Sequence, residues 1–332
     1  MPLLTPGAVH IDQPLTNLTL AYLQDQSVFL ADKIFPVVGV QKQRDNYYIY
    51  DRANMNRSGD VKLVSGRTEL NRIGQKLSYD TYDAKVWGLA MDFDEQTLAN
   101  EDSMLDIRAA GAETLMNRLL IHREEQFVDT FFTNNANWPT FTVQTGWSDI
   151  ENATPIADIT VAMTSAQLNS GGFKPNTMIV GKGVRDVLVN HPDILTRLNG
   201  GATVQNPALV TDNKLAEIFG VTNFYVLEAV KNTTHELAPN SAETESPAFI
   251  GANSCLLVYT PPAATLMTPA AGLTFAWNSL PGVNNLGVTV ESFSDDALRR
   301  QQISEHIQVK MSYDMKVVGQ ELGIFNVDPL TP

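Results

Sequence analysis

The chain has 332 residues, of which 43% are hydrophobic, and its formal net charge at pH 7 is −14. This length and composition allow a sizeable core in about two domains. The acidic balance argues against sequence-independent nucleic-acid binding, which depends on Lys and Arg neutralising phosphates. The first ten residues do not resemble a secretory signal, and no apolar run approaches the roughly 18 residues that span a bilayer, so no membrane partner is expected.

The N-terminal part of the chain is predicted to be an arm followed by a long hairpin. Residues 1–37 show no sustained period and indicate an extended arm with one short helical turn. From residue 38 the pattern is typical of strands, with residues 47–50 and 61–64 predicted to pair around a polar tip at 56–60. Because an isolated two-stranded ribbon is marginally stable in water, this hairpin needs a surface to lie on.

A long amphipathic helix is predicted next, over residues 103–132. Ser103 and Asp106 have the spacing of a capping box, and the acid at the first turn suits the helix dipole. Apolar residues recur at steps of three and four from Leu105 to Phe131. At about 1.5 Å per residue the helix would be about 45 Å long, which exceeds most globular helices.

The composition then changes to alternating helix and strand signals, which indicates a separate α/β lobe. Helices are predicted at 155–169, 183–190 and 215–219. Strands are predicted at 177–180, 223–227, 248–251, 254–259 and 273–277, and the single cysteine, Cys255, is expected to be buried in one of them. The C-terminal tail returns to strand-like alternation at 287–293, 303–313 and 315–320.

Charge is separated sharply between the hairpin and the long helix. Residues 38–76 contain eight basic and four acidic residues, whereas residues 92–129 contain ten acidic and three basic residues. This opposition predicts that the two segments meet, either within one chain or between copies of it. The candidate contact residues are Arg44, Arg52, Arg57, Lys62, Arg67 and Arg72 on the hairpin and Glu124, Glu125 and Asp129 on the helix.

No motif indicates catalysis, a cofactor or a metal. The five histidines are scattered without zinc-ligand spacing, and the sequence has no nucleophile elbow and no phosphate-binding glycine loop. The acidic clusters at 92–95 and 294–296 lack the ligand spacing and central glycine of an EF-hand, and are interpreted as solvated loops. We therefore expect no catalytic, cofactor-binding or metal-binding residues, and a protein that is not an enzyme.

The order of these elements resembles the major capsid proteins of tailed double-stranded DNA bacteriophages. The resemblance spans nearly the whole chain, and each of its pieces is weak alone. It is carried by FLADKIFPVV at 29–38, LIHRE at 120–124, KPNTMIVG at 174–181, NHPDI at 190–194, LAEIFGV at 215–221 and GLTFAW at 272–277.

The resemblance implies an α+β capsid fold of the Hong Kong phage type. Its parts would be an N-terminal arm at 1–37, an extended β-hairpin loop at 38–76, a peripheral domain with a long spine helix at 77–150 and 286–332, and an axial α/β domain at 151–285. In this family the extended loop lies across a neighbouring subunit. Hexamers and pentamers form an icosahedral shell around the genome, which is a partner only by enclosure.

The resemblance also sets expectations about partners and location. The short arm implies a separate scaffolding protein, and the family implies a portal protein and leaves room for a decoration protein. The protein is expected in the virion capsid, after synthesis and assembly in the cytoplasm of the host bacterium. One alternative is an encapsulin-like nanocompartment that encloses cargo enzymes. Another is an enzyme with an α/β lobe, which would need convergent polar groups that the sequence does not indicate.

Overall fold

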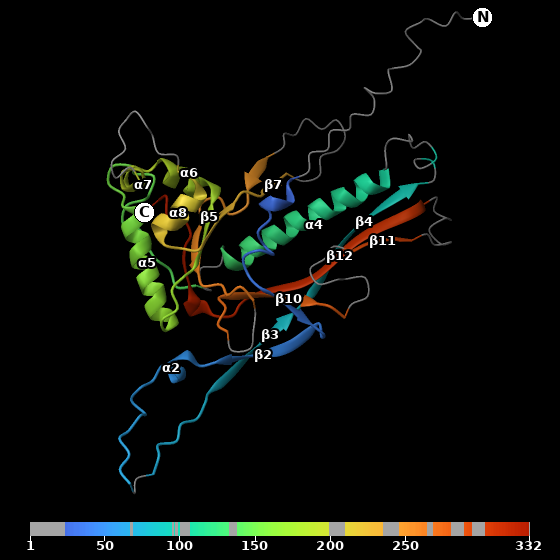
Figure 1. The fold of residues 1–332 in the computed structure, drawn as a ribbon. Coiled ribbons are helices and arrows are strands. Elements are labelled where there is room, and N and C mark those ends of the chain that lie inside the picture. The colour runs from blue at the N-terminus through green and yellow to red at the C-terminus, as the bar shows by residue number, and fades with distance from the viewer. Residues whose placement is uncertain are drawn as a thin grey trace, which may run out of the picture.

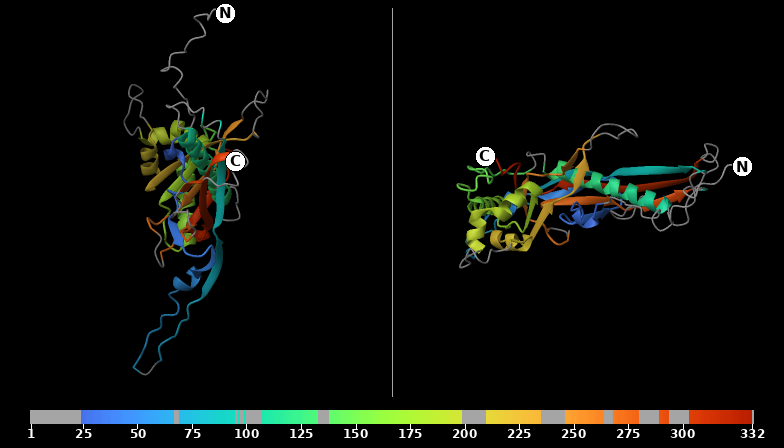
Figure 2. Two further views of the ribbon diagram at one scale, coloured as in Figure 1. Left: turned by 90° about the vertical axis from the view of Figure 1, so that its right-hand side faces the viewer. Right: turned by 90° about the horizontal axis from the view of Figure 1, so that it is seen from above.

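The computed structural model describes residues 24–66, 69–94, 96, 99, 107–132, 138–198, 210–234, 246–263, 268–279, 289–293 and 303–331. Two mixed layers of helix and sheet lie side by side, and a ribbon projects from the point where they meet (Figure 1). Turned by 90° about the vertical axis, the molecule shows the ribbon continuing well past the body (Figure 2, left). The α+β fold class predicted from the sequence is confirmed.

The larger sheet is built around one long C-terminal strand. β12 (Ile303–Val317) pairs in antiparallel fashion with β4 (Lys85–Asp94), β10 (Gly272–Trp277) and β11 (Thr289–Phe293). β1 (Val37–Val40) extends the sheet by pairing in parallel with β10. The sequence predicted β12 as two separate strands, whereas its alternation continues without a break.

α4 (Ile107–Phe131) lies along this sheet (Figure 1). It buries Leu115, Leu119 and Phe127 in the same hydrophobic cluster that contains Val309 and Met311 of β12. The predicted helix is confirmed from residue 107 onward, and its expected start at Ser103 lies outside the described residues. The apolar period of the sequence therefore identified the face that packs on the sheet.

The second layer is a four-stranded sheet covered by helices. Its strands are β13 (Gly323–Asn326), β9 (Cys255–Val258), β5 (Thr177–Gly181) and β6 (Asn223–Leu227), in that order across the sheet. The helices are α5 (Pro155–Ser170), α6 (Lys182–Asn190), α7 (Pro192–Leu198) and α8 (Asp212–Phe219).

This smaller sheet is buried on both faces, which explains its unbroken apolar strands. Met178 and Val180 of β5 join a cluster with the α5–α8 helices, while Ile179, between them, joins the cluster around α4. Cys255 of β9 is fully buried, as predicted, and burial raises the pKa of its thiol to about 12. The smaller sheet therefore contacts one hydrophobic cluster with each of its two faces.

The remaining elements are short. A 3-10 helix, η2 (Gln26–Val28), opens the described part of the arm, and a second, η4 (Gln320–Leu322), precedes β13. β7 (Val230–Asn232) and β8 (Pro247–Phe249) form a small ribbon near the arm. None of the described helices combines the length and hydrophobicity needed to cross a bilayer.

Candidate subunit interface

The projecting ribbon has a different pairing from the one predicted. β2 (Arg44–Tyr50) pairs with β3 (Leu77–Asp83), not with residues 61–64, which form no strand. The register places Arg44 opposite Asp83 and Tyr50 opposite Leu77. The prediction was wrong because residues 61–64 are only a short apolar run, whereas β3 offers a full alternating partner further along the chain.

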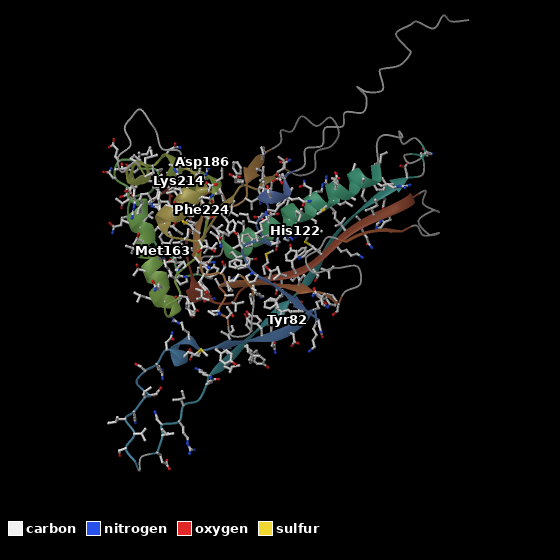
Figure 3. All side chains as sticks on the ribbon, in the orientation of Figure 1. Tyr82, His122, Met163, Asp186, Lys214 and Phe224 are labelled. Carbon is white, nitrogen blue, oxygen red and sulfur yellow. The ribbon has the colours of Figure 1, made fainter. Side chains whose placement is uncertain are left out.

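The base of the ribbon is fixed to the larger sheet by aromatic contacts. Tyr82 of β3 is buried and stacks on Phe275 of β10 at a ring-centroid distance of 4.7 Å, and Tyr47 of β2 lies 5.3 Å from the same ring. Figure 3 shows Tyr82 where the ribbon joins the body. The backbone N–H of Asp83 also donates to the Asp314 carboxylate at 2.8 Å. The ribbon therefore leaves the body from a rigid root.

Beyond the root, residues 51–76 form the distal part of the ribbon, which we call the loop. It begins with α2 (Arg52–Met55), capped by the Asp51 carboxylate, which accepts the N–H of Ala53 at 3.1 Å. The N–H of Asp51 donates to the carbonyl of Lys76 at 3.2 Å and closes the loop at its base. None of the described residues from 57 to 76 lies in a helix or strand.

The loop presents large apolar side chains to solvent. Leu63 is 98% exposed and Ile73 is 75% exposed, and the most exposed apolar residues of the loop are Val61, Leu63, Leu70 and Ile73. A hollow of about 460 Å³ lies within the loop between Tyr50, Met55 and Ile73. Because burying one such side chain stabilises by about 1.5–3 kcal/mol, this surface favours a covering partner.

Arg52, Arg57, Lys62 and Arg72 of the predicted basic set lie in the same loop as these apolar side chains, whereas Arg44 lies at the base of the ribbon, opposite Asp83. Arg44, Arg52, Arg57, Lys62 and Arg72 are all exposed, and none of them forms an ion pair within the described part of the chain. Arg67 lies outside the described residues. Arg52, Arg57, Lys62 and Arg72 therefore lie exposed on the projecting loop, and their contact with a neighbouring subunit stays a prediction.

The predicted acidic partners are placed differently from expectation. Glu124 is only 1% exposed, because it points into the subunit and accepts the backbone N–H groups of Leu30 and Ala31, each at 3.0 Å. Glu125 pairs with Lys231 in the same chain, and Asp129 is exposed. Glu124 therefore offers no surface to a neighbouring loop, and we withdraw it from the predicted contact set.

Glu124 instead connects the arm to α4 through these hydrogen bonds. Phe29, Leu30 and Phe35 of the arm are buried in the core around α4, and burial raises the pKa of the Glu124 carboxyl to about 7, despite the two N–H donors. The adjacent Arg123 is 4% exposed and lies 3.5 Å from the partly exposed Asp32. A second fastening comes from Gln24, whose side-chain amide oxygen accepts the N–H of Val230 at 3.1 Å.

Two features of this region escaped the sequence prediction. The apolar residues of the loop were assigned to a strand, although no partner of matching alternation flanks them. The inward position of Glu124 had a detectable signal, because it follows Leu120 by four residues and precedes Phe127 by three, and both are buried on the same helix face.

Two polar side chains at turns of the α/β lobe have contacts that stabilise those turns. His191 begins the turn into α7, where its ring nitrogen accepts the N–H of Asp193 at 3.2 Å. Lys182, at the strand-to-helix turn after β5, pairs with Glu228 at 2.9 Å. Among the described residues, no group of three His, Cys, Asp or Glu side chains could hold a metal ion.

Two phage proteins are similar in sequence. The chain is 26% identical over 226 residues to the major capsid protein of Pseudomonas phage JBD67, and the matched stretch covers 67% of this chain and 70% of that protein. It is 24% identical over 237 residues to the major capsid protein of Burkholderia phage BcepMu, which covers 66% of this chain and 69% of that protein. No protein-family model matches the sequence.

Several solved structures share the fold over nearly the whole chain. A phage-related protein from Bordetella bronchiseptica has a TM-score of 0.66 at 16% identity, with 93% of this chain and 95% of that chain covered. The capsid of Myoviridae phage XM1 has a TM-score of 0.58 at 10% identity, covering 98% of both chains. An encapsulin from Synechococcus elongatus has a TM-score of 0.53 at 9% identity, covering 97% of both chains.

Proposed function

We propose that this chain, which has the Hong Kong phage-type capsid fold and is related in sequence to phage major capsid proteins, self-assembles as hexamers and pentamers into an icosahedral shell around a phage genome. The observation that carries the proposal is the loop at 51–76. It projects beyond the body, exposes apolar and unpaired basic side chains, and leaves both without a covering surface in the described part of its own subunit. In the assembled shell the loop lies across a neighbouring copy.

The proposal keeps the four-part division of the chain. The arm comprises 1–37, the extended loop 38–76, the peripheral domain 77–150 and 286–332, and the axial domain 151–285. The strand pairing crosses this division twice, because β13 of the peripheral range pairs with β9 in the smaller sheet and β10 of the axial range pairs with β12 in the larger sheet. The C-terminal segment would therefore tie the two domains together during assembly.

The proposed role is structural, without an enzymatic activity. The partners are other copies of the chain, with a separate scaffolding protein and a portal protein during assembly, and a decoration protein on shells that carry one. The packaged double-stranded DNA is enclosed and not bound tightly, in keeping with the net charge of −14. Assembly takes place in the host cytoplasm, and the mature location is the virion.

An encapsulin-like compartment is the second candidate, supported by the structural likeness to the Synechococcus elongatus protein. The phage proposal is favoured because the sequence relatives are phage major capsid proteins. Electron microscopy of particles purified from a producing cell, followed by analysis of their contents, separates the two. Nuclease-protected double-stranded DNA of genome length supports the phage shell, whereas an enclosed enzyme without such DNA contradicts it.

A further inference from the structure

The outer face of α5 is uncharged along its whole length. The exposed residues of this helix are Ala157, Thr160, Val161, Thr164, Gln167, Leu168 and Asn169. Val161 is 69% exposed and Leu168 is 76% exposed, and their spacing of seven places them on one stripe. We call this surface the α5 face.

The polar groups of α5 are mostly satisfied inside the helix or beneath it. The hydroxyl of Thr160 donates to the carbonyl of Ile156 at 2.7 Å, and that of Thr164 donates to the carbonyl of Thr160 at 2.9 Å. Asp158 is the one charged residue of the helix, and its carboxylate accepts the indole N–H of Trp147 at 2.9 Å. The α5 face therefore presents few groups that require water.

The α5 face is continuous with the root of the loop. α5 is followed directly by Gly171, which adopts a left-handed φ of 79°, and a Cβ atom there would lie 2.2 Å from the side-chain amide nitrogen of Asn56. The side chain of Arg52 in α2 lies 3.5 Å from the same point, which is an ordinary van der Waals distance. Figure 1 shows α2 below the C-terminal end of α5. The α5 face and the beginning of the loop are therefore adjacent surfaces of one subunit.

We infer that the α5 face packs against a second copy of this chain, in the same subunit contact that the loop makes. The inference rests on the proposed function and extends it to a surface that the sequence did not indicate. The absence of charge indicates which partner the α5 face binds. It has no cations that could neutralise the phosphates of a nucleic acid, and no charges that could pair with those of a strongly charged protein. Copies that each carry a net charge of −14 repel one another least where their surfaces are uncharged.

Cysteine labelling tests this inference directly, because the native thiol does not interfere. Cys255 is fully buried and its pKa is raised, so a maleimide should not react with it in the folded chain. Val161→Cys and Leu168→Cys place thiols on the α5 face, and Lys214→Cys places one on the exposed surface of α8 as a control. We expect all three to react in dissociated chains, and positions 161 and 168 to lose most of their reactivity in assembled shells while position 214 keeps it.

Equal labelling of positions 161 and 168 in shells and in free chains would overturn the inference and leave the proposed function intact. Failure of the unsubstituted chain to assemble under any condition would overturn both. A second variant guards against a folding effect of the cysteines. Val161→Asp with Leu168→Asp should fold and fail to assemble, whereas Lys214→Asp, which changes the net charge by the same amount, should assemble. Normal shell yield from the double variant would also overturn the inference.

Discussion

The carboxylate of Glu124 accepts the backbone N–H of Ala31 at 3.0 Å and so joins α4 to an arm residue 93 positions away. The N–H of Leu30 donates to the same oxygen. These two donors and the burial of Phe29 and Phe35 hold the arm in the core of its own subunit. Glu124, which the charge pattern placed in a contact with a neighbouring subunit, therefore connects two segments of its own subunit.

Removal of this acceptor should weaken the fold. Glu124→Ala leaves two buried N–H groups unpaired, so we expect a loss of about 2–4 kcal/mol in the free energy of unfolding. Chemical denaturation measures the loss, and limited proteolysis should show earlier cleavage near residues 24–36. Gln126→Ala, at a half-buried position of the same helix, is the control and should change stability little. Equal stability of Glu124→Ala and the unsubstituted chain would contradict the assigned role.

Glu124 should also make stability depend on pH. Its folded-state pKa of about 7 lies above its ordinary value of 4.5, so the fold favours the protonated form. This contribution is fully present below pH 4.5 and is lost as the pH rises through 7, with a difference of about 3 kcal/mol. Burial also raises the pKa of the Asp314 carboxyl, so its contribution to stability changes with pH in the same direction.

The comparison with Glu124→Gln isolates this contribution. The unfolding free energy of the original chain, measured by denaturation between pH 5 and pH 8, should fall relative to that of the variant as the pH increases. A constant difference between the two proteins over this range would show that Glu124 does not titrate there.

The apolar residues of the loop should matter for assembly and not for folding. Leu63→Asp with Leu70→Asp places charges at positions that are exposed in the single subunit, so we expect its unfolding free energy to change by less than about 0.5 kcal/mol. Light scattering should nevertheless show loss of assembly, because these side chains lose their cover. Ser58→Asp with Gln75→Asp, at exposed polar positions of the same loop, changes the net charge by the same amount and is the matched control. Assembly by the double variant at the normal rate would exclude an apolar contact through these residues.

The basic residues of the loop should act through charge. Arg57→Glu with Arg72→Glu should impair assembly, although one exposed ion pair contributes only about 0–1 kcal/mol, because the contact repeats in every subunit. The corresponding lysine substitutions should retain assembly. Increasing the salt concentration should slow assembly of the original chain, and a shell yield insensitive to both charge reversal and salt would rule this role out.

Elements whose ends are marked by neighbouring residues could be predicted from the sequence. α5 begins at Pro155, in the first-turn position that suits proline, and ends before Gly171, whose left-handed conformation suits glycine. β9 is an unbroken apolar run, as expected for a strand buried on both faces. Each of these elements is determined by a few neighbouring residues, so its type and limits could be predicted.

The remaining features depend on contacts distant in sequence. The partner of β2 is β3, which begins 27 residues after β2 ends, and no local pattern fixes that register. α7 and β13 were missed, because α7 is a short helix directly after α6 and β13 is a four-residue strand that forms by pairing with β9. For the candidate interface, the basic residues were located from sequence, whereas the direction of Glu124 depends on how the arm folds back onto α4.

Removal of the loop tests the central claim most directly. Tyr50 and Leu77 face each other across the ribbon, so an Asn-Gly turn can replace residues 51–76 and keep the register of β2 and β3. We expect negative-stain microscopy to show closed shells for the complete chain and only folded, unassembled subunits for the shortened one. Identical shells from both chains, or a complete chain that remains monomeric under all assembly conditions, would contradict assembly through the loop.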